Sequence, residues 1–182
     1  MSSAPTPAGP DAFRAAMRRL AGAVNIVTSA SGDRRAGMTA TAVCSVSADP
    51  PTILVCINRH AATRDVVVAS GVFCVNILRA EDWELSTAFG GAMPAEQRFG
   101  SRHWSVEGTG APVLADALCA LDCCVVQTIE HATHSIFLGV VRFVSTGTAG
   151  MPLIYSSGTY ARVAALETPH PLPEGSEGWG FW

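Results

Sequence analysis

One stretch of small hydroxyl residues, closed by two prolines, constrains the fold of this chain most. It runs from Gly37 to Pro51, and its hydroxyl side chains alternate with small apolar ones. Residues two apart in a strand point to the same side, so the pattern predicts one strand with a polar face. That face comprises Thr39, Thr41, Ser45 and Ser47. It is either an ordinary solvated edge or the binding surface for a polar ligand that needs many hydrogen bonds.

Most of the other periodic segments also predict strands. The expected strands are 23–29, 52–58, 72–78, 118–130, 135–146, 151–155 and 160–164. Short helices are expected over 11–20, with Asp11 as N-cap, over 63–69 and over 81–89, and residues 90–104 are expected to be mostly loop. The gaps are turn-sized and strict alternation of strand and helix is absent. The chain is therefore predicted to be mostly β, a β-barrel with peripheral helices.

Composition narrows the setting. The chain has 182 residues, 48% of them hydrophobic and 15% charged, which allows one domain with a large core. A net charge of −3 without a Lys/Arg block argues against nucleic acid and anionic membranes as partners. No signal peptide or membrane span is visible, so a cytoplasmic location is expected. We expect a disordered tail over 1–10, one domain over 11–166 and a Pro/Gly-rich tail over 167–182.

The six cysteines do not form a metal-binding pattern. They are Cys44, Cys56, Cys74, Cys119, Cys123 and Cys124, without a Cys-x-x-Cys pair or a histidine at zinc-finger spacing. In a cytosolic protein they are expected to be small buried hydrophobic residues, and no metal site is predicted.

A candidate anion site lies where a predicted strand runs into a predicted helix, between Asn58 and Arg64. Free N–H groups at a helix start attract anions, Thr63 could cap the helix or donate to a ligand, and Arg64 could add a bidentate contact. An ordinary capped helix with solvated arginines explains the segment equally well. No Rossmann fingerprint exists, because Gly108-Thr109-Gly110 is followed by Ala111-Pro112 and no helix pattern opens there.

His134, at the head of a strand, is a second candidate. It could contact a substrate at a barrel mouth, or it could be a solvated turn residue. The neighbouring Glu130 and His131 could supply proton chemistry, although nothing in their spacing requires it.

Several of these segments occur in a recognisable order. The matching stretches are 37–41, 45–51, 73–78, 98–100, 110–114, Cys123 in its strand, His134 with 136–141, and 153–160. Over about residues 12 to 163 the chain resembles the flavin reductase family with the FMN-binding split-barrel fold. These proteins are the small reductase components of two-component flavin monooxygenases.

The resemblance implies roles for individual residues. Met38, Thr39, Ala40, Thr41, Cys44 and Ser45 would line the isoalloxazine and ribityl chain, and Cys56, Ile57 and Asn58 would lie along the flavin. Thr63 and Arg64 would hold the phosphate; Asn76, Arg98 and Phe99 would lie near the flavin's tail; His134, the implied catalytic residue, and Tyr160 would flank the nicotinamide. The implied cofactor is FMN, with FAD possible, the cosubstrate is NADH or NADPH, and the chain would be a homodimer with the flavin at or near the interface.

Two features depart from the family pattern. Many relatives have Gly-Asp-His where this chain has Ala132-Thr133-His134, so the acidic residue that could orient the histidine is missing. The segment after Glu167 is also outside the pattern. Its aromatic residues, Trp179, Phe181 and Trp182, either pack on a partner subunit, cap the site or are disordered.

The function that follows is an NAD(P)H:flavin oxidoreductase that supplies reduced flavin to a partner monooxygenase. Hydride transfer needs two stacked rings about 3–3.5 Å apart and hydrogen bonds that stabilise the reduced flavin. A strand of small residues allows both. Two alternatives remain: a non-catalytic flavin- or haem-binding protein, and a reductase of another acceptor, such as cobalamin or a ferric chelate, with tightly bound flavin.

Overall fold

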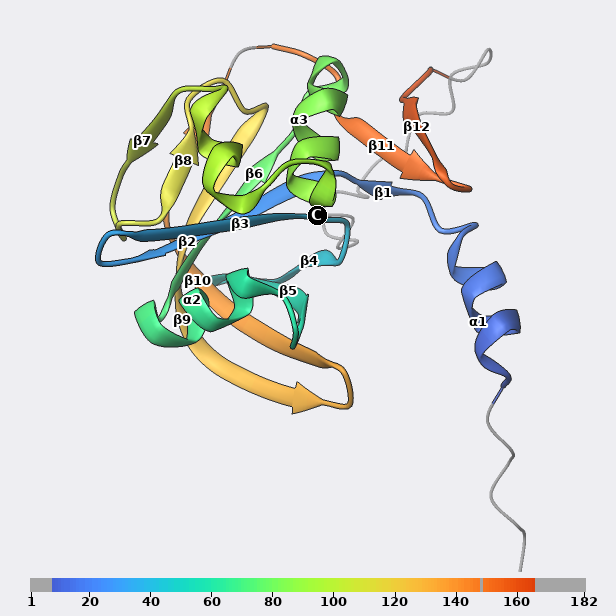
Figure 1. The fold of residues 1–182 in the computed structure, drawn as a ribbon, viewed down its shortest axis with the longest axis horizontal. Coiled ribbons are helices and arrows are strands. Elements are labelled where there is room, and N and C mark those ends of the chain that lie inside the picture. The colour runs from blue at the N-terminus through green and yellow to red at the C-terminus, as the bar shows by residue number, and fades with distance from the viewer. Residues whose placement is uncertain (1–7, 148, 166–182) are drawn as a thin grey trace, which may run out of the picture.

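The fold is built on one seven-stranded sheet in which every neighbouring pair is antiparallel (Figure 1). The computed structural model describes residues 8–147 and 149–165. In spatial order the strands are β3 (Arg34–Ala40), β2 (Asn25–Ser31), β6 (Val72–Ile77), β9 (Cys119–His131), β10 (His134–Thr146), β5 (Pro51–Asn58) and β4 (Val43–Ala48). Two small sheets add β1 (Gly22–Ala23), β11 (Leu153–Ser156) and β12 (Thr159–Arg162), and β7 (Trp104–Val106) with β8 (Pro112–Leu114). The mostly-β prediction is confirmed.

The expectation of one strand from Gly37 to Pro51 is wrong. The segment forms β3 and β4, which are the two opposite edges of the sheet and are joined only by Thr41 and Ala42. A link this short allows at most about 11 Å between the Cα atoms of Ala40 and Val43. Hydrogen-bonded strands lie about 4.8 Å apart. The sheet must therefore curl until its edges are close, and it forms a barrel that stays split between β3 and β4.

The barrel interior is filled by apolar side chains that are almost completely buried. They come from every strand of the barrel except β4, whose Val43 is partly buried, and include Val27, Val55, Ile57, Phe73, Val75 and Phe137. Helix α2 (Ala62–Ser70) packs on β2 and β3 through Val66 and Val67. It ends at Gly71, whose φ of 71° is the left-handed conformation that glycine adopts without strain.

A second cluster packs outside the barrel against β3. The predicted helix 81–89 is three shorter elements, η1 (Ala80–Asp82), α3 (Trp83–Thr87) and the π-helical turn η2 (Ala88–Ala92). Gly91, at φ 118°, interrupts the last of these. The expected loop 90–104 contains the short 3-10 helix η3 (Ala95–Gly100). Three rings, Phe89, Phe99 and Trp104, pack with centroids 5.0–5.5 Å apart and hold these elements together.

The first helix and the cysteines differ from the sequence expectations. Helix α1 (Pro10–Met17) begins one residue before the predicted Asp11 cap, and its N-cap is Gly9 without a side-chain cap. Of the predicted tails, residues 8–10 lie within the described residues, and 167–182 lie outside them.

Among the cysteines, Cys74 and Cys123 are buried as expected, and burial raises the pKa of the Cys123 thiol to about 12. Cys44 is exposed on the edge strand β4. In the described part of the chain, no helix is long and apolar enough to cross a membrane.

A four-membered salt-bridge cluster anchors the segment that carries η3. Asp82 is 1% exposed and accepts bonds from Arg79 and Arg102, both at 2.9 Å. Asp116 bridges the same two arginines at 3.0 and 2.7 Å. The cluster therefore ties η1, the chain after η3 and the turn after β8 into one unit.

We expect Asp82→Ala to lower the free energy of unfolding by about 3 kcal/mol, because it removes a buried carboxylate shared by two partly buried guanidinium groups. Asp11→Ala, in the exposed Asp11–Arg14 pair, should change it by less than about 0.5 kcal/mol. Urea unfolding of both variants measures the difference. Equal losses would show that the cluster does not anchor the fold.

Candidate functional site

A basic cleft of about 360 Å³ lies between β3, α2 and η3. Its lining consists of Arg34, Arg35, Ala36, Gly37, Met38, Ala61, Ala62, Thr63, Ala95 and Arg98. Three guanidinium groups and no carboxylate are among these residues. The cleft is therefore suited to an anion.

The N-terminus of α2 closes one end of the cleft without a side-chain cap. Ala61 is the N-cap residue and offers no side-chain acceptor to the first N–H groups of the helix. Thr63 is only 3% exposed and lines the cleft, yet its hydroxyl has no hydrogen-bond partner among the described residues. The oxygen of this hydroxyl is not among the buried polar atoms that lack a partner, so it is accessible from the cleft and free to donate to a ligand. The helix end and Thr63 together point to a ligand with oxygen acceptors.

The opposite wall is held by close packing at Gly37. A Cβ at this position would lie 2.6 Å from a ring carbon of Phe89, so only glycine lets the aromatic cluster reach β3. Arg98 donates to the Gly37 carbonyl at 3.2 Å and to the Met93 carbonyl at 3.0 Å. The Arg35 guanidinium lies 4.9 Å from the centre of the Phe99 ring. Two of the three cations are thus fixed in place before any ligand binds.

A second cavity, of about 290 Å³, lies farther along β3. It is lined by Val24, Thr39, Ala40, Thr41, Ser86, Gly90, Tyr155 and Tyr160. Thr39 donates to the Ser86 carbonyl at 2.6 Å, and the Ser86 and Tyr160 hydroxyls are 2.9 Å apart. The cavity therefore combines an aromatic wall with hydroxyls that are already oriented.

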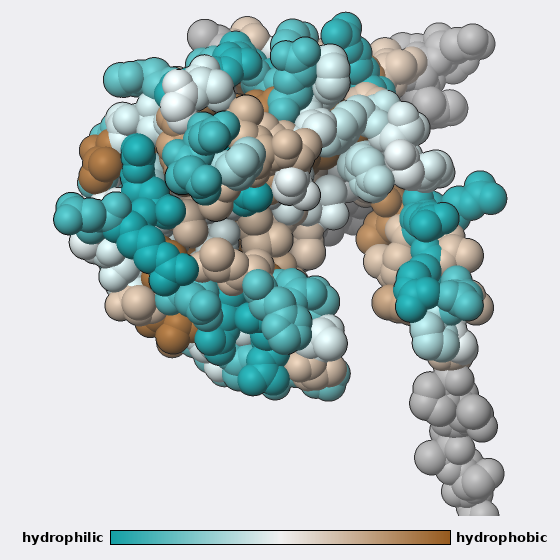
Figure 2. Space-filling model, in the orientation of Figure 1, coloured by the Kyte–Doolittle hydropathy of each residue, from teal (hydrophilic) through white to brown (hydrophobic). Residues whose placement is uncertain are grey.

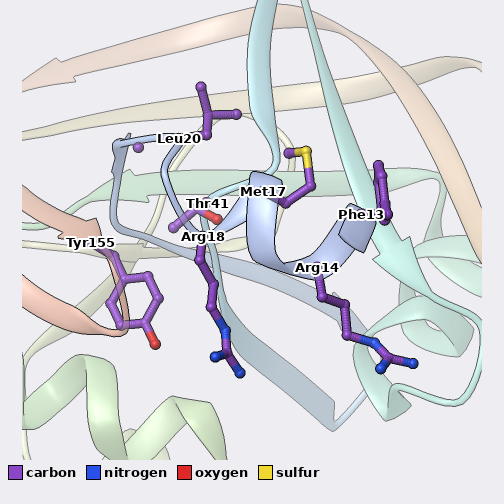
Figure 3. A pocket seen from close by; sticks show the side chains of 8 residues that line it. Phe13, Arg14, Met17, Arg18, Leu20, Thr41 and Tyr155 are labelled. Carbon is purple, nitrogen blue, oxygen red and sulfur yellow. The ribbon is translucent and has the colours of Figure 1, made fainter. Parts of the chain in front are cut away.

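Thr41, in the link between the edge strands, also borders two other cavities. One, of about 390 Å³, contains Cys44 and Ser45 of β4. The other, of about 360 Å³, separates α1 from the barrel; Figure 3 shows Phe13, Arg14 and Met17 on α1, with Thr41 and Tyr155 also lining it. Thr41, at the split of the barrel, therefore lines three cavities, although it does not line the basic cleft.

The structure brings about half of the predicted flavin residues to these cavities. Lining them are Met38, Thr39, Ala40, Thr41, Cys44, Ser45, Thr63, Arg98 and Tyr160. Cys56, Ile57, Asn58, Arg64, Asn76, Phe99 and His134 do not line them. Ile57 and Phe99 are buried in the two hydrophobic clusters, Cys56 is half-buried, and the Asn58 side chain accepts a bond from the His60 amide at 2.9 Å.

Asn76 requires a correction. It was expected near the flavin's tail, but it is completely buried. Its amide donates to the Ile26 carbonyl at 3.0 Å and to the Thr28 hydroxyl at 3.2 Å, and it accepts from the Leu114 amide at 2.7 Å. These bonds connect β2, β6 and β8, so in the structure Asn76 has a packing role.

Arg64 points away from the cleft, toward the β9–β10 hairpin. Its guanidinium contacts Glu130 at 2.8 Å and the Ser135 hydroxyl at 3.2 Å. Sequence reasoning missed Arg34 and Arg35, which line the cleft instead. They precede the Gly37 motif directly, but only the tertiary structure places their strand beside α2.

His134 and Tyr160 do not share a pocket within one chain. His134 is exposed at the tip of the β9–β10 hairpin, opposite Asn58 of β5, whereas β12 with Tyr160 lies at the other side of the molecule (Figure 1). The Thr133 hydroxyl is 2.9 Å from His134 Nδ1 and occupies the place of the missing acidic residue. Ala132, where relatives have glycine, adopts φ 46° in this turn.

The hairpin's attachment to α2 should depend on pH. The Arg64 guanidinium, and next the Ser135 hydroxyl, lower the pKa of Glu130 from its ordinary value of 4.5. A lowered folded-state pKa contributes stability above the unfolded value, and that stability is lost as the pH falls through the folded value. We expect the difference in unfolding free energy between wild type and Glu130→Gln to shrink as the pH is lowered from about 6 to 3. Urea unfolding across this range measures it, with Glu81→Gln as control, and a difference independent of pH would contradict the expectation.

Comparison with known proteins shows the family of the chain. The flavin reductase like domain matches residues 17–164. FMN reductase (NADH) RutF of Agrobacterium fabrum is 48% identical over 148 residues, which cover 81% of this chain and 85% of the relative.

Two solved structures share the fold over almost the whole length. Nitrilotriacetate monooxygenase component B from Mycobacterium thermoresistibile has a TM-score of 0.82 at 26% identity and covers 92% of this chain and 94% of its own. The NADH:FAD oxidoreductase SgcE6 from Streptomyces globisporus has a TM-score of 0.81 at 25% identity and covers 94% and 99%. The resemblance seen in the sequence is confirmed, and the chain belongs to the flavin reductase like domain family.

Proposed function

We propose that this protein is an NADH-dependent flavin reductase that reduces FMN, accepts FAD as well, and supplies reduced flavin to a separate monooxygenase. The names of its relatives support each element: an NADH-dependent FMN reductase, an NADH:FAD oxidoreductase and a monooxygenase component. A cytoplasmic location is part of the proposal, because NADH and the oxygenase must be available in the same compartment.

The observation that carries the proposal is the unpartnered Thr63 hydroxyl at the uncapped start of α2, in a cleft lined by arginines. This is the environment that the terminal phosphate of FMN needs. In the proposal Thr63 donates to that phosphate and Arg98 neutralises it. Arg64, which sequence reasoning assigned to the phosphate, instead holds the hairpin that carries His134 through Glu130 and Ser135.

The edges of the split barrel would bind the rest of the flavin. As edge strands, β3 and β4 each have one row of backbone N–H and C=O groups without a strand partner. In the proposal these groups, with Thr39, Thr41 and Ser45, hydrogen-bond the ring system and the ribityl chain. Met38, Ala40 and Cys44, which line the cavities, would lie beside them.

The nicotinamide would enter from the side of Tyr160, whose hydroxyl is fixed by Ser86 at 2.9 Å. The flavin accepts the hydride at N5, so the chain's task is to align two rings and to exclude water. Since His134 lies far from Tyr160 in one chain, we infer that His134 reaches a nicotinamide site completed by a second subunit.

A homodimer is therefore part of the proposal, and α1 supports it. The helix stands away from the barrel and has no buried residue (Figures 1 and 2). Phe13, Met17 and the following Leu20 are 60%, 45% and 67% exposed. Covering this apolar stripe with a second subunit would gain roughly 25 cal/mol for each Å² buried.

The test of the function is anaerobic oxidation of NADH with FMN, FAD or riboflavin in excess. We expect multiple turnovers with FMN. Reduction that stops at one equivalent would mean a bound prosthetic flavin and another acceptor, and flavin binding without NADH oxidation would mean a storage protein.

The phosphate assignment is tested by flavin binding. Thr63→Val should raise the Kd for FMN about tenfold and leave the Kd for riboflavin unchanged, whereas Thr63→Ser should leave both values unchanged. Equal weakening of both flavins would refute the phosphate assignment.

The dimer is tested by mass. Light scattering should give the wild-type protein a mass of two chains. The double variant Phe13→Ser/Met17→Ser should have the mass of one chain. Val106→Ser removes a residue that is 65% exposed on β7 and should leave the mass unchanged. A monomeric wild type, or a dimer that survives the double substitution, would contradict the role of α1.

A further inference from the structure

The basic cleft is longer than one phosphate needs. Along β3 it runs from Met38 to Arg34, which at about 3.3 Å per residue is roughly 13 Å. The uncapped start of α2 and Thr63 close it on the α2 side, and Arg34 and Arg35 lie toward the β2–β3 turn. The monophosphate of FMN, bound at Thr63, would leave the end with Arg34 and Arg35 unfilled.

The arginines at this second end have no anionic partner. Arg59, Arg64, Arg79 and Arg102 all form ion pairs with carboxylates. Within the described residues, Arg34 and Arg35 form none. Both side chains line the same cleft, so an anion bound there could gain a charge-assisted contact from each.

One of the two side chains is already oriented. The Arg35 guanidinium packs on the Phe99 ring at 4.9 Å, and Phe99 is itself fixed by Phe89 and Trp104. Arg35 is exposed at the cleft, so a planar base could stack on the guanidinium face that Phe99 does not cover. The end of the cleft thus offers both phosphate recognition and a surface for an adenine ring.

We propose that Arg34 and Arg35 form a second phosphate subsite, which binds the pyrophosphate and adenosine part of FAD. The inference rests on the proposed function and extends it: Thr63 and Arg98 hold the phosphate that FMN and FAD share, and Arg34 with Arg35 hold the part that only FAD has. The choice between the two flavins is then made at the β2–β3 turn, away from the flavin ring. FMN and riboflavin do not extend to this end.

The test is equilibrium binding of FAD, FMN and riboflavin, measured by quenching of flavin fluorescence without NADH. For the double variant Arg34→Ala/Arg35→Ala we expect the Kd for FAD to rise tenfold or more, and those for FMN and riboflavin to stay within about twofold. ADP, as a probe of the adenosine end alone, should displace FAD from wild type. Arg142→Ala removes an exposed arginine on β10 and should change none of these values.

Each other outcome has a definite meaning. If FMN weakens as much as FAD, Arg34 and Arg35 serve the single phosphate and the second subsite is refuted. If no affinity changes, the ligand does not reach them and the inference is equally refuted. Arg34→Lys/Arg35→Lys keeps the charges and should recover part of the FAD affinity, which separates lost charge from misfolding. Because binding is measured without NADH, the proposed reductase activity can fail while this result stands, and the reverse.

Discussion

The two-residue link between β3 and β4 is the constraint on which the rest of the structure depends. Strands at opposite edges of a seven-stranded sheet are joined by Thr41 and Ala42 alone. The sheet has to curl so that its edges come within about 11 Å, and curling encloses the apolar core. β3 and β4 do not pair with each other, so the barrel stays open between them. The unpaired backbone groups of both edges are thereby left beside the cavities that meet at Thr41.

Packing outside the barrel fixes the walls of the cleft. Gly37 lets the Phe89 ring approach β3, and Phe99 and Trp104 complete the aromatic cluster. The buried Asp82 with Arg79 and Arg102 anchors the same segment from the other side. Arg98 and Arg35 are held by this framework rather than by a ligand, so the ordering of their side chains costs little on binding.

Two groups of arginines have different roles. Arg59, Arg64, Arg79 and Arg102 are neutralised by carboxylates and hold elements together. Those of the cleft, Arg34, Arg35 and Arg98, have no ion pair within the described residues and surround an uncapped helix start. Since a sequence shows only that arginines are present, their electrostatic role depends on which carboxylates the fold brings to them.

The sequence by itself determined the strand-rich class, the long hairpin of β9 and β10 and helix α2, because local periodicity and turn residues encode these features. The family motifs also marked the stretch from Met38 to Ser45. Only the tertiary structure decided that this stretch is two edge strands, that Asn76 is a buried packing residue, and that Arg64 pairs with Glu130 while Arg34 and Arg35 line the cleft. The physical reason is that each of these outcomes depends on a contact between segments far apart in the chain, and such contacts leave no local pattern.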